Sequence, residues 1–185
     1  MSWVCTDQIG MSAVVPVPAK EQSRMTQLYI GIDPGLDGAV GFLDATAEAV
    51  RTPTIKVGKR RQYRAQEMSE IIQDRLPLGG PGNRFAILES VHSMPKQGVA
   101  SSFSFGRGFG LWEGILVALG IPYLLVAPQT WKAVMLRDMP KDKNAAKIQA
   151  SRLWPELGRL SDGEAEALLM AEYGRRLQIG KDHAE

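Results

Sequence analysis

Short apolar runs that end at turn-forming residues recur along this chain and predict strands. They occupy residues 28–32 (LYIGI), 39–44 (AVGFLD), 85–89 (FAILE) and 123–128 (YLLVAP). Apolar runs of this length bounded by Gly, Pro or Asp are typical of buried strands. The first two runs flank a short turn and predict a hairpin. Apolar and polar residues alternate in segment 49–55 (AVRTPTI), which predicts a third strand with Pro53 at an edge or a bend.

Apolar residues at helical spacing predict the helices. They are expected at residues 64–76, about 111–119, 128–136, 141–154 and 162–177. Gly120 ends the second of these, and Pro128 lies in the first turn of the third. Ile148 and Leu153 are expected to face the core, and Asp162 is expected to cap the last helix. Three tryptophans in these patterns are also expected in the core: Trp112, Trp131 and Trp154.

The order of these elements indicates an α/β fold. Three hairpin-connected strands followed by βα units predict a mixed sheet, in which three antiparallel strands precede parallel ones and helices flank the sheet. We expect one domain over residues 25–180, with a flexible extension at 1–24 and a short tail at 181–185. The extension lacks the basic and apolar regions of a secretory signal.

Composition is that of a folded domain with a sizeable core. The chain has 185 residues, 44% of them hydrophobic, and no apolar stretch is long enough to span a bilayer. The single cysteine, Cys5, excludes an internal disulfide framework and a cysteine-based zinc site. We therefore expect a cytoplasmic protein with no membrane partner.

Basic residues are segregated along the chain, although the formal net charge is only +2. Residues 51–64 carry six basic residues and no acid, and residues 132–152 are also mostly basic. Segregated Lys and Arg suit a polyanion such as DNA. A solvated loop and a solvated helix face are the alternative interpretations. The candidate DNA-binding residues are Lys59, Arg60, Arg61, Arg64, Arg107 and Lys141.

A glycine-rich segment, SFSFGRGFG, holds three aromatic residues around Arg107. They are Phe103, Phe105 and Phe109. Aromatic residues beside Arg can stack on unpaired bases. Packing in the core or at a subunit interface is the interpretation that we favour for this segment. A dinucleotide-binding loop is improbable, because the glycines do not follow a strand.

Four acidic residues lie where strands end or where a helix begins. Asp33 follows the first strand and Glu89 ends the strand at 85–89, so both emerge at one edge if these strands are neighbours. Asp162 and Glu166 are four apart and share one helix face, while Glu164 points elsewhere. Like charges gathered in this way repel unless a metal ion binds them. The pattern predicts a magnesium site suited to phosphodiester hydrolysis.

Five segments together resemble the RuvC-type Holliday junction resolvases of the RNase H-like superfamily. They are YIGIDPGLDGAVGFLD, FAILES, PQTWKAVML, KDKNAAKIQASRLWP and DGEAEALLMAEY. The resemblance runs from about Leu28 to Tyr173, most of the chain. The Trp131-Lys132 pair and the AEALLMA helix make the phage and phage-derived bacterial branch the most similar.

This resemblance implies a homodimer that nicks four-way DNA junctions with two Mg²⁺ ions per site, or with Mn²⁺, in a bacterial or phage-infected cell. Asp33 would bridge the ions, and Glu89, Asp162 and Glu166 would complete their shell. Two lysines would approach the scissile phosphate: Lys132 and Lys143.

The chain departs from the family pattern in two places. The last two acids of the family pattern are often both Asp and three residues apart. In this chain they are Asp162 and Glu166, four residues apart. This difference leaves Glu164 as an alternative ligand. An aromatic wedge often follows the second acid. Here His92 or a Phe of residues 103–109 would have to take that role.

Other functions stay open at this stage. A nuclease of the same fold could cut RNA–DNA hybrids or flap DNA, and a non-catalytic protein could bind junctions. An actin-like kinase or ATPase also opens with an acidic strand and a Gly turn, but it needs two such domains, and 185 residues have room for one.

Overall fold

The computed structural model describes residues 27–76, 84–90 and 98–182. Its strands are β1 (Leu28–Ile32), β2 (Ala39–Leu43), β3 (Ala47–Arg51), β4 (Thr54–Val57), β5 (Arg60–Tyr63), β6 (Arg84–Glu89) and β7 (Tyr123–Val126). Its helices are α2 (Ala65–Gln73), α3 (Val99–Ala118), α4 (Pro128–Met135), α5 (Ala145–Leu153) and α6 (Asp162–Asp182), with a short 3-10 turn at Pro155–Leu157. No helix in the described part of the chain is both long and apolar enough to cross a membrane.

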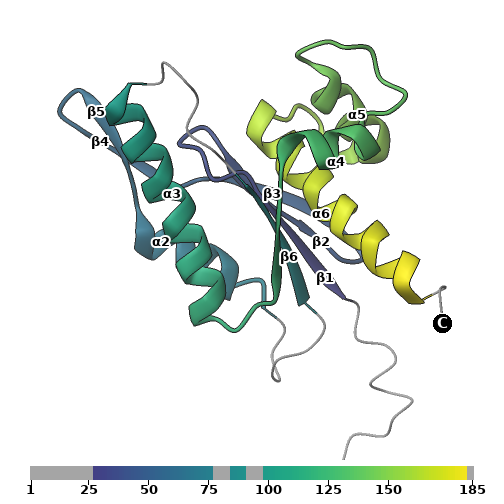
Figure 1. The fold of residues 1–185 in the computed structure, drawn as a ribbon, viewed down its shortest axis with the longest axis horizontal. Helices are drawn as coiled ribbons and strands as arrows, with labels where there is room; N and C mark the ends of the chain where they lie inside the picture. The colour runs from purple at the N-terminus through teal and green to yellow at the C-terminus, as the bar shows by residue number, and fades with distance from the viewer. Residues whose placement is uncertain (1–26, 77–83, 91–97, 183–185) are drawn as a thin grey trace, which may run out of the picture.

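Five strands form one mixed sheet in the order β3-β2-β1-β6-β7 (Figure 1). Strands β1, β2 and β3 are antiparallel neighbours, while β6 runs parallel to β1 and β7 runs parallel to β6. The predicted fold, three antiparallel strands followed by parallel βα units, is therefore confirmed.

Helices cover both faces of this sheet, and each face has its own apolar core. Helices α2 and α3 lie on one side, and α4, α5 and α6 lie on the other (Figure 1). Side chains alternate along β1, so Ile30 joins the core under α2 and α3, while Tyr29 joins the core under α6. The three tryptophans expected in the core are buried, with Trp112 and Trp131 fully enclosed.

Helix α6 lies unusually close to the sheet because glycines face it. A Cβ at Gly31 of β1 would overlap the carbonyl oxygen of Ala167, and a Cβ at Gly41 would come within 2.7 Å of the same residue's backbone. At the start of α6, a Cβ on Gly163 would lie 2.5 Å from the carbonyl oxygen of Asp37. These contacts place the N-terminal end of α6 against the turn that follows β1.

The segment predicted as one strand at 49–55 is divided, and the basic loop predicted after it is a hairpin. Strand β3 ends at Arg51, β4 begins at Thr54, and β4 pairs with β5, which holds much of the basic segment. The hairpin is anchored by Tyr63, whose buried side chain donates a hydrogen bond to the carbonyl of Pro34 at 3.2 Å. Its apolar ring holds β5 in place, so the basic residues are carried on a regular element.

Helix α3 begins at Val99 rather than near residue 111. The glycine-rich segment is helical, and within it Gly108 meets Tyr63 and Pro34 so closely that no Cβ would fit there. This glycine lets α3 pack closely against the hairpin and the β1–β2 turn. The end of α3 agrees with the sequence, since Gly120 adopts a positive φ of 61° just beyond it.

Two further expectations about helices were wrong. Ile148 and Leu153 of α5 are exposed by 41% and 37%, while the face toward α6 consists of three alanines, Ala145, Ala146 and Ala150. Small residues allow α5 to approach α6 closely, so the larger apolar side chains point outward. Asp162 is the first residue of α6 and does not cap it. Ser161 caps it instead, because its hydroxyl accepts the N–H of Glu164 at 3.3 Å.

Candidate active site

Two carboxylates emerge side by side from the ends of parallel strands. Ile32 of β1 pairs with Leu88 of β6, so Asp33 and Glu89 occupy the next positions at the same edge of the sheet. Asp33 Oδ1 accepts the N–H of Gly35 at 3.1 Å, which holds this carboxylate over the turn. Glu89 is only 7% exposed, and its Oε1 accepts a hydrogen bond from the indole Nε1–H of Trp131 at 2.9 Å.

Helix α6 adds two more carboxylates to this edge. Asp162, Glu166 and Asp33 line one cavity of about 490 Å³, and Lys143, from the segment before α5, lines it as well. The expected common face of Asp162 and Glu166 is therefore confirmed. Sequence positions from β1, α6 and the α4–α5 connection meet in this cavity.

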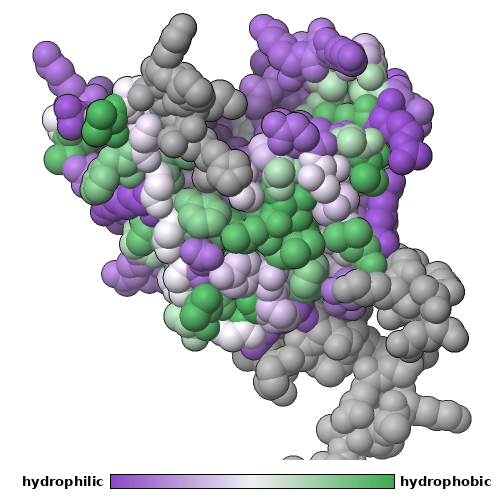
Figure 2. Space-filling model, in the orientation of Figure 1, coloured by the Kyte–Doolittle hydropathy of each residue, from purple (hydrophilic) through white to green (hydrophobic). Residues whose placement is uncertain are grey.

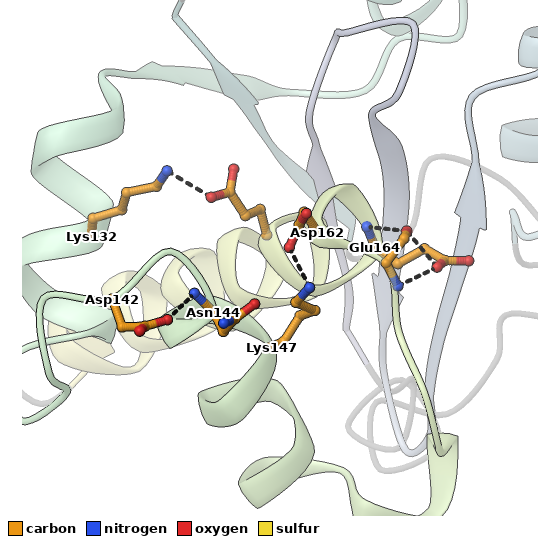
Figure 3. Close-up of polar contacts among 8 residues, drawn as sticks. Lys132, Asp142, Asn144, Lys147, Asp162 and Glu164 are labelled. Carbon is orange, nitrogen blue, oxygen red and sulfur yellow. Dashed lines mark hydrogen bonds and ion pairs between the residues drawn. The ribbon is translucent and has the colours of Figure 1, made fainter.

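Lysines already pair with both α6 carboxylates. The Nζ of Lys132 on α4 lies 2.7 Å from Glu166 Oε1, and the Nζ of Lys147 on α5 lies 2.9 Å from Asp162 Oδ1. Figure 3 shows both lysines reaching toward α6 from their own helices. The cluster is thus partly neutralised by side chains from α4 and α5.

The two strand-end carboxylates have less compensation, and their pKa values show it. Burial raises the pKa of Asp33 to about 6; the negative charge of Glu166 adds to the rise, and the Gly35 N–H opposes it. Burial raises the pKa of Glu89 to about 7. The hydrogen bond from Trp131 lowers this pKa, and the negative charge of Asp33 raises it further. The charge of Glu166 raises the pKa of both carboxyls, and a nearby cation would favour their ionised forms.

Glu164 belongs to a different structure. Its carboxylate accepts the N–H of Ser161 at 2.8 Å (Figure 3). The same carboxylate lies 3.3 Å from Nε of Arg51. Burial of this carboxylate is outweighed by the hydrogen bonds from Ser161, so its pKa lies below the usual range. Glu164 forms a capping box with Ser161 and faces away from the cavity.

The chemistry of this donor set suits a hard divalent cation. Glu89 is a buried carboxylate and Asp33 a partly buried one, and carboxylate oxygens are ligands that Mg²⁺ prefers. In the described residues, no three acidic, histidine or cysteine side chains are arranged so that they could hold a metal ion. Glu166 and Asp162 are paired with Lys132 and Lys147 in this structure.

The predicted DNA-binding residues are divided between several places. Arg60 and Arg61 of β5 and Arg107 of α3 line a second cavity beside the first. Arg64 pairs with Glu67 of α2 and lines neither of these two cavities. Two exposed lysines lie outside both cavities: Lys59 in the β4–β5 turn and Lys141 before α5. His92 lies outside the described residues.

The structure adds residues that the sequence did not single out. Trp131 was expected only as a core residue, but it also holds Glu89. Lys147 was not expected near Asp162, although its position on the helix at 141–154 put it in a basic region. Tyr63 lines the acidic cavity, which nothing in its sequence context indicated. Phe105, one of the aromatic residues considered for base stacking or for the wedge, lines this cavity as well.

Comparison with solved structures identifies the fold. The chain superposes on Thermus thermophilus RuvC in complex with a Holliday junction substrate with a TM-score of 0.52 and 16% identity, covering 78% of this chain and 90% of that one. A second Thermus thermophilus RuvC structure gives a TM-score of 0.50 at 16% identity, covering 78% of this chain and 91% of RuvC. The chain has the RNase H-like fold of RuvC. A scan of protein-family models and a search of curated proteins each gave no match.

Proposed function

We propose that this protein is a magnesium-dependent endonuclease that cuts branched DNA, with Holliday junctions as its substrate. The observation that carries the proposal is the meeting of Asp33, Glu89 and Glu166, from β1, β6 and α6, at one edge of a RuvC-like sheet. Glu89 is buried, Asp33 is partly buried, and the pKa values of both are raised. Such groups beside a cavity are typical of catalytic sites.

Each residue has a role in the proposed reaction. Divalent cations held by Asp33, Glu89, Asp162 and Glu166 would supply an activated water and charge neutralisation at the leaving oxygen. Trp131 keeps the Glu89 carboxylate in place. Lys143 lines the cavity and is placed to contact a phosphate there, and Lys132 orients Glu166.

The basic hairpin and Arg107 support DNA as the substrate. Their guanidinium groups lie beside the acidic cavity, so a DNA strand with its phosphate at the carboxylates would pass close to them. The preference for junctions rests on the likeness to RuvC, which has been solved with a Holliday junction. A homodimer, a place in the phage-derived branch and a cytoplasmic location are parts of the same proposal.

The proposal is tested with a panel of labelled substrates. A synthetic four-way junction, a linear duplex, a flap and an RNA–DNA hybrid are incubated with the protein, with and without Mg²⁺ or Mn²⁺. We expect paired nicks in opposing strands of the junction, which require the ion and disappear in Asp33→Asn. If the hybrid or the flap is cleaved in preference to the junction, that nucleic acid is the substrate and the assignment of the junction is wrong. Tight junction binding without cleavage would indicate a non-catalytic protein.

A further inference from the structure

A second cavity adjoins the acidic one and differs from it in charge. This cavity, of about 440 Å³, runs between β5 and the N-terminal half of α3, and we call it the hairpin groove. It shares four lining residues with the acidic cavity: Leu36, Tyr63, Ser101 and Ser104. The two cavities are therefore continuous, and a chain-like ligand could pass from one to the other.

The hairpin groove is strongly basic. Arg60 and Arg61 line it from β5 and Arg107 lines it from α3, while no acidic side chain of the described residues lines it. Arg61 is paired with Asp37 at 2.8 Å, at the border with the acidic cavity. Neither Arg60 nor Arg107 has an ion pair within the described part of the chain, so both guanidinium groups can bind an anion.

An exposed aromatic ring completes the groove. Phe103 lines it and is 75% exposed. Phe103 and Arg107 are four residues apart on α3, so they lie on one side of this helix, one turn apart. A ring face and a guanidinium at this spacing suit a base and its phosphate.

We propose that the hairpin groove binds an unpaired polynucleotide strand, with a base stacked on Phe103 and phosphates on Arg60 and Arg107. The proposal rests on the proposed function, because the strand would be the one that leads away from the cleavage site. It makes unpaired nucleotides beside the scissile phosphate a requirement for tight binding. Ser101 and Ser104 line both cavities and offer hydroxyl groups along the same path.

The size of the groove favours an unpaired strand over a duplex. Sites for small ligands occupy roughly 300–1,000 Å³, so the groove has the volume expected of a site for a nucleotide. Stacking on Phe103 also requires an accessible base face, which bases inside a duplex do not offer. A duplex could contact the rim arginines only through its phosphates.

The test measures binding without cleavage. Fluorescence anisotropy in EDTA gives the affinity of the full chain for labelled single-stranded DNA, single-stranded RNA and duplex DNA. Phe103→Ala should weaken single-strand binding about 5- to 150-fold, as expected for the loss of one stacked base, and leave duplex binding unchanged. Arg60→Gln and Arg107→Gln should each lower the slope of log K against log salt by about 0.7 for single strands.

Two matched variants serve as controls. Phe103→Tyr keeps the ring and should retain single-strand affinity. Val117→Ala removes another exposed apolar side chain of α3, outside the groove, and should have no effect. The proposal is overturned if Phe103→Ala binds single strands as tightly as the native protein does, or if it loses affinity equally for single strands and duplex. It is also overturned if the substitution changes the oligomeric state in place of the single-strand affinity.

Failure of the groove and failure of the nuclease have different signatures. If the protein cleaves junctions but Phe103→Ala leaves single-strand affinity unchanged, only the proposal for the groove is overturned. Phe103-dependent strand binding in a protein that cuts nothing overturns only the nuclease. A Phe103-dependent loss on either DNA or RNA supports the groove, and the larger loss identifies the preferred sugar.

Discussion

At the scale of single residues, the site depends on how the carboxylates of Asp33 and Glu89 are held. Glu89 is almost fully enclosed, and its hydrogen bond from Trp131 is the one polar contact that the described residues give it. Asp33 is held by the backbone of the turn that follows it. The indole of Trp131 is therefore part of the site, although the sequence indicated only a core residue.

The role of Trp131 leads to the first prediction. Trp131→Phe keeps an aromatic ring but removes the donor to Glu89, and we expect metal affinity and cleavage to fall by about 10- to 100-fold. Trp112→Phe is the matched control, because Trp112 is equally buried and its Nε1 has no partner within the described residues. Calorimetric metal titration and cleavage rates are measured on both, and equal effects in the two variants would contradict the role of Trp131.

Much of the residue-scale site could be predicted, and the limits have physical causes. Asp33 and Glu89 follow apolar strands, and Asp162 and Glu166 share a helix face, so these acids were visible as a pattern. The pairing of Asp162 with Lys147 was not visible, because it depends on how α5 packs on α6. That packing is set by three alanines, which carry little signal in the sequence.

At the scale of elements, the start of α6 determines where two of the acids lie. Gly163 brings this end of the helix against the β1–β2 turn, and Ser161 and Glu164 form its cap. Helix α6 is therefore fixed at the end that carries Asp162 and Glu166. The cap was mislocated by one residue from the sequence, since Ser and Asp are both good N-caps.

The second prediction concerns this contact. Gly163→Ala would place a Cβ 2.5 Å from the backbone oxygen of Asp37, which cannot yield easily. We expect a loss of about 1–3 kcal/mol in the free energy of unfolding and a fall in cleavage, because Asp162 and Glu166 shift with the helix. Urea unfolding and junction cleavage measure the two effects.

Gly114→Ala provides the comparison for that variant. A Cβ at Gly114 of α3 would meet nothing within 4 Å, so this change should add up to about 1 kcal/mol of stability through helix propensity alone. A loss of stability in Gly114→Ala, or none in Gly163→Ala, would contradict the packing described for these helices.

The elements themselves were predictable to different degrees. Strands β1, β2 and β6 were expected close to their observed bounds, because buried central strands are continuous apolar runs. Strand β7 was also located, but the expectation that it is buried was wrong, because it is an edge strand whose Leu124 and Leu125 are exposed. The hairpin β4–β5 was missed, because its stability comes from Tyr63 packing under α3 and not from an apolar alternation. The early start of α3 was missed for the same reason, since glycines in isolation predict a loop.

At the scale of the whole molecule, stability should depend on pH through Asp33 and Glu89. Both carboxyls bind protons more tightly in the folded protein, with pKa values of about 6 and 7 against 3.8 and 4.5 in the unfolded chain. The folded state therefore loses stability as pH rises from about 4 to about 7. Glu48 and Glu164 have lowered pKa values and act in the opposite direction, at more acidic pH.

The third prediction follows from this sign. In EDTA, the melting temperature should be lower at pH 8 than at pH 5, and Mg²⁺ should reduce the difference. Glu89→Gln can still accept the Trp131 hydrogen bond. Its melting temperature at pH 8 should exceed that of the native protein by about 2–4 °C for each kcal/mol of unfolding free energy that the substitution recovers. At pH 5 the two proteins should melt at the same temperature. A native protein that melts higher at pH 8 in EDTA would contradict the raised pKa values.

Part of the surface of the described residues is apolar. Figure 2 shows hydrophilic side chains at the hairpin end and apolar ones across the middle of the same face. The exposed apolar residues include Leu124 and Leu125 of β7, each 43% exposed, and Val117 of α3. The homodimer stays a prediction, and light scattering of the full chain at several concentrations tests it.

The central claim, that Asp33, Glu89 and the α6 acids bind divalent cations together, is tested most directly by calorimetric titration with Mn²⁺ near neutral pH. The native protein should show saturable binding, and Asp33→Asn should lose it while keeping the melting temperature of a folded domain. Saturable binding that is equally strong in Asp33→Asn would contradict the claim.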